Sequence, residues 1–407
     1  MKIRSITCFF DPRARDAHQT MERIGQLRQA AYNQYIRTGM EVESTRLASA
    51  PFPYLYEISQ VERAVDLAQH LEADGKARGF EYISVGPALT SDPASYGMVT
   101  PMLAATRDVF TGGMLTTPNG EVSLAAVQAC AEIIRSASTI TPDGFTNLRF
   151  AALANVGPWV PFLPGAYHQG ERPAFALAIE CADVAYSAVR KARTLAEARQ
   201  TIIDTLEAEA VAMTSTANFL AQRFDADFKG IDFSYAPYPE AWCSLGAALE
   251  ALGLPALGQS GSLAAAAFLA DTLDRGSWMR TGYNGLMMPV LEDSTLAARA
   301  AEGAITVQDL LAYSAVCGTG LDTIPLPGDA SAGQIAAVLL DVAALALRLN
   351  KPLTARLMPI PGKRAGDLVE YDFSYSTRSA VMALRAAPLD HLFGGDETIS
   401  IRPRGRM

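Results

Sequence analysis

Charged residues are scarce in this sequence. Asp, Glu, Lys and Arg make up 19% of the 407 residues and hydrophobic residues make up 49%, whereas charged residues are about a quarter of a typical soluble domain. The net charge is −9 and no block of Lys and Arg alternates with aromatic residues, so nucleic-acid binding is not expected. So little charge in a long chain predicts a large buried interior, a large subunit interface, or both.

Several well-known catalytic motifs are missing. The sequence contains no GxGxxG after its first predicted strand, no GxxxxGK[ST], no GxSxG and no HExxH. These absences argue against a nicotinamide-dependent dehydrogenase, a P-loop NTPase, an α/β-hydrolase and an HExxH metalloprotease, in that order. We therefore expect no nicotinamide cofactor.

Cysteine pairs and membrane segments are also missing. Five cysteines are each more than 50 residues from the next, and none forms a CxxC pair. A dispersed, odd number of cysteines argues against a cysteine-based zinc site and fits reduced thiols in the cytosol. The N-terminus lacks the apolar core of a signal peptide, and Asp341 interrupts the longest apolar stretch, 336–349. We therefore expect a cytoplasmic protein without a membrane span.

Strand-like and helix-like segments alternate along the chain. The stretches 2–10, 149–156, 174–180 and 353–360 are rich in apolar residues and predict buried strands, whereas 194–223 has helical spacing. About ten strand-like segments separated by helices predict an α/β fold with a parallel or mixed sheet, as in a barrel. We expect one domain over 1–375 and a C-terminal appendage over 376–407 that could serve as an oligomer contact.

Four polar stretches follow predicted strands, where α/β folds place their sites. The first, 155–170, holds Asn155 as a candidate ligand-binding residue and His168 as a candidate general acid or base. The alternative is a histidine that only hydrogen-bonds a neighbouring loop. In the second, 232–242, Asp232 and Ser234 share one strand face and predict a polar site, with a surface position as the alternative.

The third stretch, 258–268, begins a predicted helix. Ser260, Gly261 and Ser262 precede an alanine-rich helical run. The free backbone N–H groups and the dipole of a helix N-terminus favour an anion such as carboxylate or phosphate. Ordinary N-capping by a serine is the alternative.

The fourth polar stretch combines 280–293 with 315–329. Asn284, Glu292, Asp293 and Asp322 carry oxygen ligands that suit Mg²⁺ or Ca²⁺, and the alternative is acids that face water.

Cys317 lies in the second part of that stretch, beside Gly318 and Gly320, which are candidate ligand-binding residues. It is either a nucleophile with a lowered pKa or a packed small apolar residue. The predicted catalytic set is His168, Cys317, Asp232 and Asp322.

Nine segments in a fixed order resemble one known family. They are MKIRSIT, ESTRLASAPFP, TPMLAATRDVF, PFLPGAYHQG, GIDFSYAPYPEAW, GQSGSLAAAA, MMPVLED, AVCGTGLDTIPLPGD and LTARLMPIPGKRAGDLVEY. Together they resemble the uncharacterised family called domain of unknown function 711. The resemblance implies a pyruvate formate-lyase-like fold, in which two half-barrels dock antiparallel into a ten-stranded α/β barrel surrounded by helices.

Glycyl radical enzymes of that superfamily carry a cysteine on a loop inside the barrel and a glycine near the C-terminus in a pattern like RVxGY. Cys317 resembles the first feature. The nearest match to the second, Arg280-Thr281-Gly282-Tyr283, is one residue short and far from the C-terminus. The resemblance therefore implies the barrel without the glycyl radical.

Two functions remain open from the sequence. The first is an enzyme that binds a small anionic metabolite in the barrel interior, with no reaction type indicated. The second is a non-catalytic oligomeric binding or assembly protein. The low charge predicts a homo-oligomer in either case.

Overall fold

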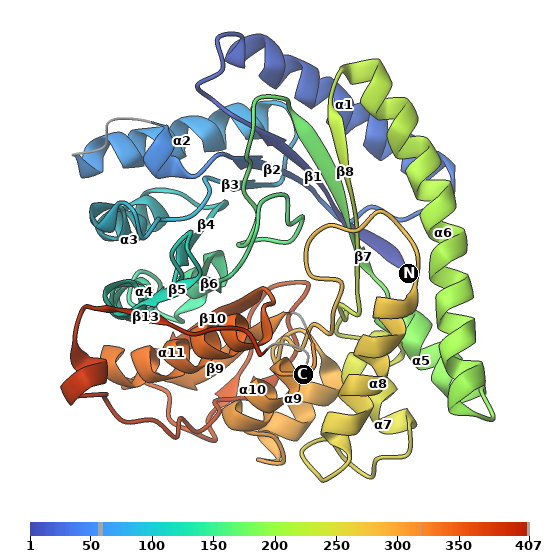
Figure 1. Cartoon of the computed structure of the whole chain (residues 1–407), viewed down its shortest axis with the longest axis vertical. Coiled ribbons are helices and arrows are strands. Elements are labelled where there is room, and N and C mark those ends of the chain that lie inside the picture. Colours follow the sequence, from blue (N-terminus) through green and yellow to red (C-terminus); the bar gives the residue numbers. More distant parts are fainter. Residues whose placement is uncertain (56–59, 318, 405–407) are drawn as a thin grey trace.

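The predicted α/β architecture is confirmed. The computed structural model describes residues 1–55, 60–317 and 319–404, and nine strands form one sheet in the order β8-β7-β1-β2-β3-β4-β6-β10-β9 (Figure 1). The strands are β1 (Lys2–Phe10), β2 (Thr45–Ser49), β3 (Tyr82–Ser84), β4 (Val109–Met114), β6 (Phe150–Ala154), β7 (Ala174–Glu180), β8 (Asp227–Ser234), β9 (Gly320–Pro327) and β10 (Leu353–Ile360).

The strands fall into two groups that run in opposite directions. Strands β1, β2, β3, β4 and β6 are mutually parallel. Strands β7 and β8 are parallel to each other, as are β9 and β10. The pairs β1–β7 and β6–β10 are antiparallel. The carboxyl ends of the two groups therefore lie at opposite ends of the sheet.

Helices surround the sheet on its outer side (Figure 1). They are α1 (Ala17–Arg37), α2 (Val61–Ala77), α3 (Tyr96–Ala105), α4 (Leu124–Ala137), α5 (Ala182–Lys191), α6 (Leu195–Phe224), α7 (Leu245–Ala251), α8 (Ser262–Arg275), α9 (Ser294–Ala301), α10 (Val307–Ser314) and α11 (Ala332–Leu349). The start of α6 follows from its sequence, because the Thr194 side chain accepts a hydrogen bond from the Glu197 N–H.

A loop that joins β6 to β7 packs against the inner side of the strands. We call residues 156–168 the interior loop. The hydroxyls of Ser5 and Thr7 donate to the Pro161 carbonyl, and the Ser84 hydroxyl donates to the Ala166 carbonyl. Apolar loop residues pack with strand residues in two inner clusters. With helices outside and this loop inside, a strand such as β7 is buried on both faces, which explains its continuous apolar sequence.

Two segments differ from the sequence-based prediction. The predicted strand 285–291 is present only as isolated parallel bridges, Ile231–Arg280 and Tyr235–Leu286 to the β8 side and Pro289–Asp322 to β9. The stretch 320–327, which the sequence indicated as a ligand loop, is strand β9. Its two prolines, Pro325 and Pro327, are tolerated because they follow the single bridge at Asp322, and from there β9 pairs only with β10 in the described part of the chain.

Within the part of the chain that the structure describes, α11 is the one helix whose length and composition would allow it to cross a membrane. It packs against α4, β6 and β10.

The C-terminal residues fold back onto the main body. Strand β12 (Ser379–Ala380) pairs with β11 (Leu368–Val369), and β13 (Thr398–Ser400) pairs with β5 (Glu121–Ser123).

Candidate functional site

A small cavity of about 80 Å³ lies among the strands, which is room for several water molecules. We call it the central cavity. It lies where the amino-terminal halves of β1 and β2 approach the carboxyl ends of β7 and β8. Its charged lining residues are Arg4, Arg46, Arg356, Glu180, Glu292 and Asp322, and its tyrosines are Tyr82, Tyr283 and Tyr375.

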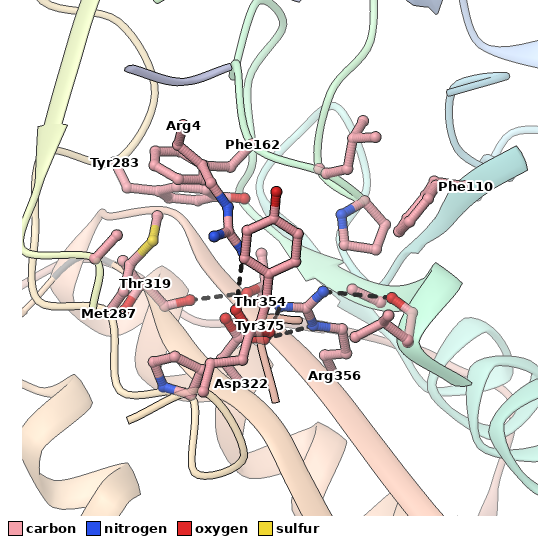
Figure 2. Close-up of a pocket in the computed structure, with 18 of the residues that line it drawn as sticks. Arg4, Phe110, Phe162, Tyr283, Met287, Thr319, Asp322, Thr354, Arg356 and Tyr375 are labelled. Atoms are coloured by element: carbon pink, nitrogen blue, oxygen red, sulfur yellow. Dashed lines mark hydrogen bonds and ion pairs between the residues drawn. The ribbon is translucent and has the colours of Figure 1, made fainter. Parts of the chain in front are cut away.

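An ion-pair network connects most of these charges. Arg4 Nη1 lies 2.6 Å from Glu180 Oε1, and Arg4 Nη2 lies 3.1 Å from Glu292 Oε2. Arg356 Nη2 lies 3.3 Å from Glu292 Oε1, and Arg356 Nε lies 2.6 Å from Asp322 Oδ1. Figure 2 shows Arg4, Arg356 and Tyr375 converging on the cavity. Buried charges need such partners because leaving one unpaired costs several kcal/mol.

Two of the arginines lie at irregularities of the sheet, Arg4 in a β-bulge and Arg356 opposite one. The register of β1 against β7 shifts between Ile3 and Ser5, with Arg4 as the extra residue. The register of β10 against β9 shifts between Ala355 and Leu357, where Asp322 and Thr323 of β9 stand opposite Arg356 of β10, so the extra residue lies on β9. A bulge bends a strand and redirects one side chain, and bulges are over-represented beside active sites.

Arg46 differs from the other two arginines because it has no acidic partner. Its Nε donates to Ser44 Oγ at 3.1 Å, and the described residues give its guanidinium no ion pair. Only 8% of the residue is exposed. Burial, followed by the nearby charge of Arg4, lowers the pKa of Arg46 to about 10. Arg46 therefore carries a buried positive charge at neutral pH.

Glu180 is the acid most affected by burial. Burial raises the pKa of Glu180 to about 8 against the opposing effect of Arg4. Its Oε2 is buried and has no hydrogen-bond partner among residues 1–55, 60–317 and 319–404. Burial also raises the pKa of Glu292, which Arg356 and Arg4 oppose. Arg4 also lies 3.2 Å from Glu43 Oε2, so Glu43, Glu292 and Asp322 remain as acidic partners of Arg4 and Arg356 when Glu180 is protonated. The group left to bind an anion is therefore Arg46, which has no acidic partner among the described residues.

Aromatic side chains cover the cavity. The Tyr375 ring lies 3.9 Å from the Arg4 guanidinium, and the rings of Phe373 and Tyr375 are 5.1 Å apart. Both side chains are half-exposed, so the segment that carries them separates the cavity from solvent. On the inner side, a Cβ at Gly165 would collide with the Tyr283 hydroxyl. Glycine at that position lets the interior loop approach Tyr283.

The predicted site residues do not all gather in one place. Asp322 lines the central cavity, whereas His168 and Asn155 line a second cavity. Asp232 is fully buried and accepts from Tyr283 N at 2.6 Å and Asn284 N at 2.9 Å. Asp232 therefore holds the segment that carries Tyr283 in place.

Two predicted stretches lie outside both cavities. Ser260, Gly261 and Ser262 lie at the start of α8 and line neither cavity, and the Ser262 hydroxyl donates to the Gln259 carbonyl at 2.7 Å. Cys317 is 3% exposed and does not line the central cavity, although nearby Thr319 does.

The two glycines near Cys317 complete the predicted set. Gly320 begins β9, where a Cβ would collide with the Thr354 backbone. Gly318 lies outside the described residues.

The proposed oxygen ligands for Mg²⁺ or Ca²⁺ have other partners. Asp293 accepts from Ser244 Oγ at 2.6 Å and caps α9, and Asn284 Oδ1 accepts from the Trp278 ring N–H at 3.0 Å. Asp322 and Glu292 pair with arginines. No group of three or more His, Cys, Asp or Glu suited to a metal ion occurs in the described ranges. This arrangement suits an anion better than a divalent cation.

The sequence analysis missed Arg4, Arg46, Arg356 and Glu180. Each is a charged residue within or at the end of a strand that is otherwise largely apolar, as in KIRSITCFF, LTARLMPI and AFALAIE. Charges rarely enter such strands unless they are paired or functional, so this signal was present in the sequence.

The fold and this cavity define an α/β protein with a buried arginine–carboxylate site. The chain belongs to the family described as "Uncharacterised ACR (DUF711)", whose model matches residues 1–376. This confirms the predicted family.

Its relatives carry the description "UPF0210 protein". The chain is 34% identical to one from Pyrobaculum aerophilum over 379 residues, which cover 89% of this chain and 83% of the relative. It is 28% identical to one from Acetivibrio thermocellus, over 82% of this chain and 77% of the relative. It is 29% identical to one from Neisseria meningitidis, again over 82% and 77%.

Proposed function

We propose that this protein is an enzyme that binds a small anionic metabolite in the central cavity. The observation that carries the proposal is Arg46, a buried guanidinium with no acidic partner among the described residues. Keeping such a charge costs folding free energy, which a bound carboxylate or phosphate would offset. Guanidinium groups bind both anions through two parallel hydrogen bonds.

The acids of the cavity support proton transfer as the chemistry. A Glu180 pKa of about 8 keeps this carboxyl protonated yet able to release its proton near neutral pH, which is what a general acid requires. Arg46 would bind the anionic group, Glu180 would donate or accept the proton, and Tyr283 would supply a hydrogen bond.

We also propose that the sheet closes into the ten-stranded pyruvate formate-lyase-like barrel. The segment 280–289 makes single bridges to the β8 side and to β9, the two outermost strands of the sheet, and so supplies a tenth position. A cytoplasmic location is part of the proposal, supported by five buried cysteines that are all free thiols.

A thermal-shift screen of small carboxylates and phosphates tests the proposal. We expect at least one of them to raise the unfolding temperature of the wild-type protein. Arg46→Met removes the buried charge at similar volume, so it should raise the unfolding temperature without ligand and abolish the ligand-induced shift. A matched surface variant, Arg275→Met, should leave the shift unchanged.

Two results would contradict the proposal. One is the absence of any shift by small anions in the wild-type protein. The other is an Arg46→Met variant that is less stable than wild type and keeps the ligand shift, because Arg46 would then have a structural role only.

A second candidate function, an oligomeric binding or assembly protein, is supported by α6. The eight exposed residues from Thr205 to Gln222 are all uncharged, and Val211 is 73% exposed and Phe219 58% exposed. Asp204 and Arg223 are exposed at opposite ends of this face. In an antiparallel pair of α6 helices with Asp204 beside Arg223 of the second copy, Phe219 would pack on the small Ala208. We propose this face as a homodimer contact, which an enzyme could also have.

A further inference from the structure

A second cavity, of about 610 Å³, lies at the other end of the strands from the central cavity. Every strand of the first parallel group contributes residues that come soon after its carboxyl end. They are Asp11 after β1, Tyr54 after β2, Ser91 after β3, Thr116 after β4 and Asn155 after β6. We call it the outer cavity.

The opposite directions of β7 and β8 and of the first parallel group place a cavity at each end of these strands. Ligand sites of α/β proteins form outside the carboxyl ends of parallel strands, where the connecting loops meet. The central cavity lies beside the carboxyl ends of β7 and β8, and the outer cavity lies at those of β1, β2, β3, β4 and β6. A sheet built from two antiparallel groups therefore has two such ends.

Asn155 provides a free hydrogen-bonding group in the outer cavity. It has a positive φ of 55°, and its backbone N–H donates to Thr116 Oγ1 at 3.0 Å. Its side-chain amide makes no hydrogen bond to any residue of the described ranges. The amide therefore has both donor and acceptor capacity left for a ligand.

His168 adds an unused acceptor to the same wall. The ring is 1% exposed, and its Nε2 lies 2.9 Å from the Gly170 carbonyl, which can only accept. Nε2 therefore carries the hydrogen, and Nδ1 is left as a buried acceptor with no partner in the described part of the chain. Burial lowers the pKa of His168, so the ring is neutral at neutral pH.

The outer cavity has no cation available for an anionic ligand among its described lining residues. Its one arginine, Arg13, pairs with Asp11 through three contacts, at 3.0 and 3.2 Å from Nε and 2.6 Å from Nη2. Arg13 also donates to the Tyr54 carbonyl at 2.9 Å. The exposed Glu171 adds negative charge at the rim. This cavity therefore disfavours the anions that suit the central cavity.

We propose that the outer cavity binds an uncharged, hydroxyl-rich small molecule, either a free sugar or the sugar part of a nucleoside, with Asn155 as its main hydrogen-bonding residue. The volume falls within the roughly 300–1,000 Å³ of known ligand pockets. The apolar Leu89, Met114 and Val156 and the rings of Tyr54 and Tyr167 supply surfaces for the C–H faces of a sugar.

Isothermal titration calorimetry with ribose, glucose, uridine, adenosine and uridine monophosphate tests this proposal. We expect at least one uncharged probe to bind, and uridine monophosphate to bind about tenfold more weakly than uridine if the nucleoside is the ligand. Binding by ribose or glucose but by neither nucleoside identifies a free sugar. Binding by a nucleoside but by neither sugar identifies a nucleoside.

The variants separate this cavity from the central one. Asn155→Gly keeps the left-handed backbone and removes the amide, so it should weaken binding by about tenfold or more. Asn155→Asp tolerates the same backbone but loses the donor, and should also weaken binding. Arg46→Met, in the central cavity, should leave binding unchanged.

The proposal is overturned by any of three results. The first is that no uncharged probe binds at millimolar concentration. The second is that uridine monophosphate binds as tightly as uridine. The third is that both Asn155 variants, shown to be folded by circular dichroism, bind like wild type. Loss of anion binding by Arg46→Met would bear only on the proposed function of the central cavity.

Discussion

Arg4 and Arg356 hold opposite oxygens of one carboxylate. Arg4 reaches Glu292 Oε2 at 3.1 Å from β1, and Arg356 reaches Glu292 Oε1 at 3.3 Å from β10. Glu292 thus links two strands that are not neighbours in the sheet. Glu292 and Arg356 are buried and the Arg4 side chain is 12% exposed, so their pairing contributes both to the stability of the fold and to the shape of the central cavity.

Replacing Glu292 with glutamine should destabilise the protein strongly. Glu292→Gln leaves two buried arginines short of one charge partner, and we expect the free energy of unfolding to fall by about 3–5 kcal/mol. Urea denaturation measures this loss. The matched control is Asp271→Asn, which removes an exposed partner of Arg275 and should cost no more than about 1 kcal/mol. Equal losses in the two variants would contradict the role of the buried network.

The stability of the protein should fall as pH rises toward 8. The folded pKa of Glu180, about 8, exceeds its ordinary 4.5, so the folded state binds this proton more tightly than the unfolded state. The contribution of protonated Glu180 to the free energy of unfolding is therefore fully present below pH 4.5 and is lost as pH rises through 8. The free energy of unfolding falls by at most about 1.4 kcal/mol per pH unit on this account.

The control for this pH dependence is Glu180→Gln, which cannot titrate. Asp232, whose pKa burial raises to about 6, contributes in the same direction, so the comparison needs the difference between wild type and variant. Urea denaturation at pH 5, 6, 7 and 8 should give a shallower slope for Glu180→Gln. Identical slopes would show that Glu180 is ionised in the folded protein.

Adding one methyl group to the interior loop should disturb the central cavity. In Gly165→Ala the new Cβ would meet the Tyr283 hydroxyl, and we expect a loss of about 1–3 kcal/mol in the free energy of unfolding. Removing that hydroxyl in the double variant Gly165→Ala/Tyr283→Phe should recover part of the loss. A double-mutant cycle with no coupling between the two positions would contradict the contact.

Charge reversal tests the proposed contact between α6 helices. Val211→Glu should shift the protein toward monomer in light scattering, because it introduces charge into an uncharged face. Asp204→Arg and Arg223→Asp should each weaken the dimer by a few-fold, and the double variant should restore it. A wild-type protein that is monomeric at micromolar concentration would rule the contact out.

The sequence by itself determined several elements of the fold, although not the segments 285–291 and 320–327. Strand β7 matches the predicted 174–180 and β10 matches 353–360, because apolar runs of that length favour buried strands over helices. The capping threonine Thr194 fixed the start of α6 for a local reason, a side chain that bonds a backbone N–H three residues later. The sequence also placed Asn155 and His168 in the same predicted loop, and both line the outer cavity.

Only the tertiary structure decided which charges meet. Arg4 lies 176 residues from Glu180 and 288 from Glu292, and no local pattern records such a pairing. The register of the strands, the bulge at Arg4 in β1 and the bulge at Asp322 and Thr323 in β9 bring these side chains to one cavity. The separation of His168 from Asp322 was likewise decided by the tertiary structure, because Asp322 lies within strand β9 beside Arg356 whereas His168 lies in the loop beyond the carboxyl end of β6.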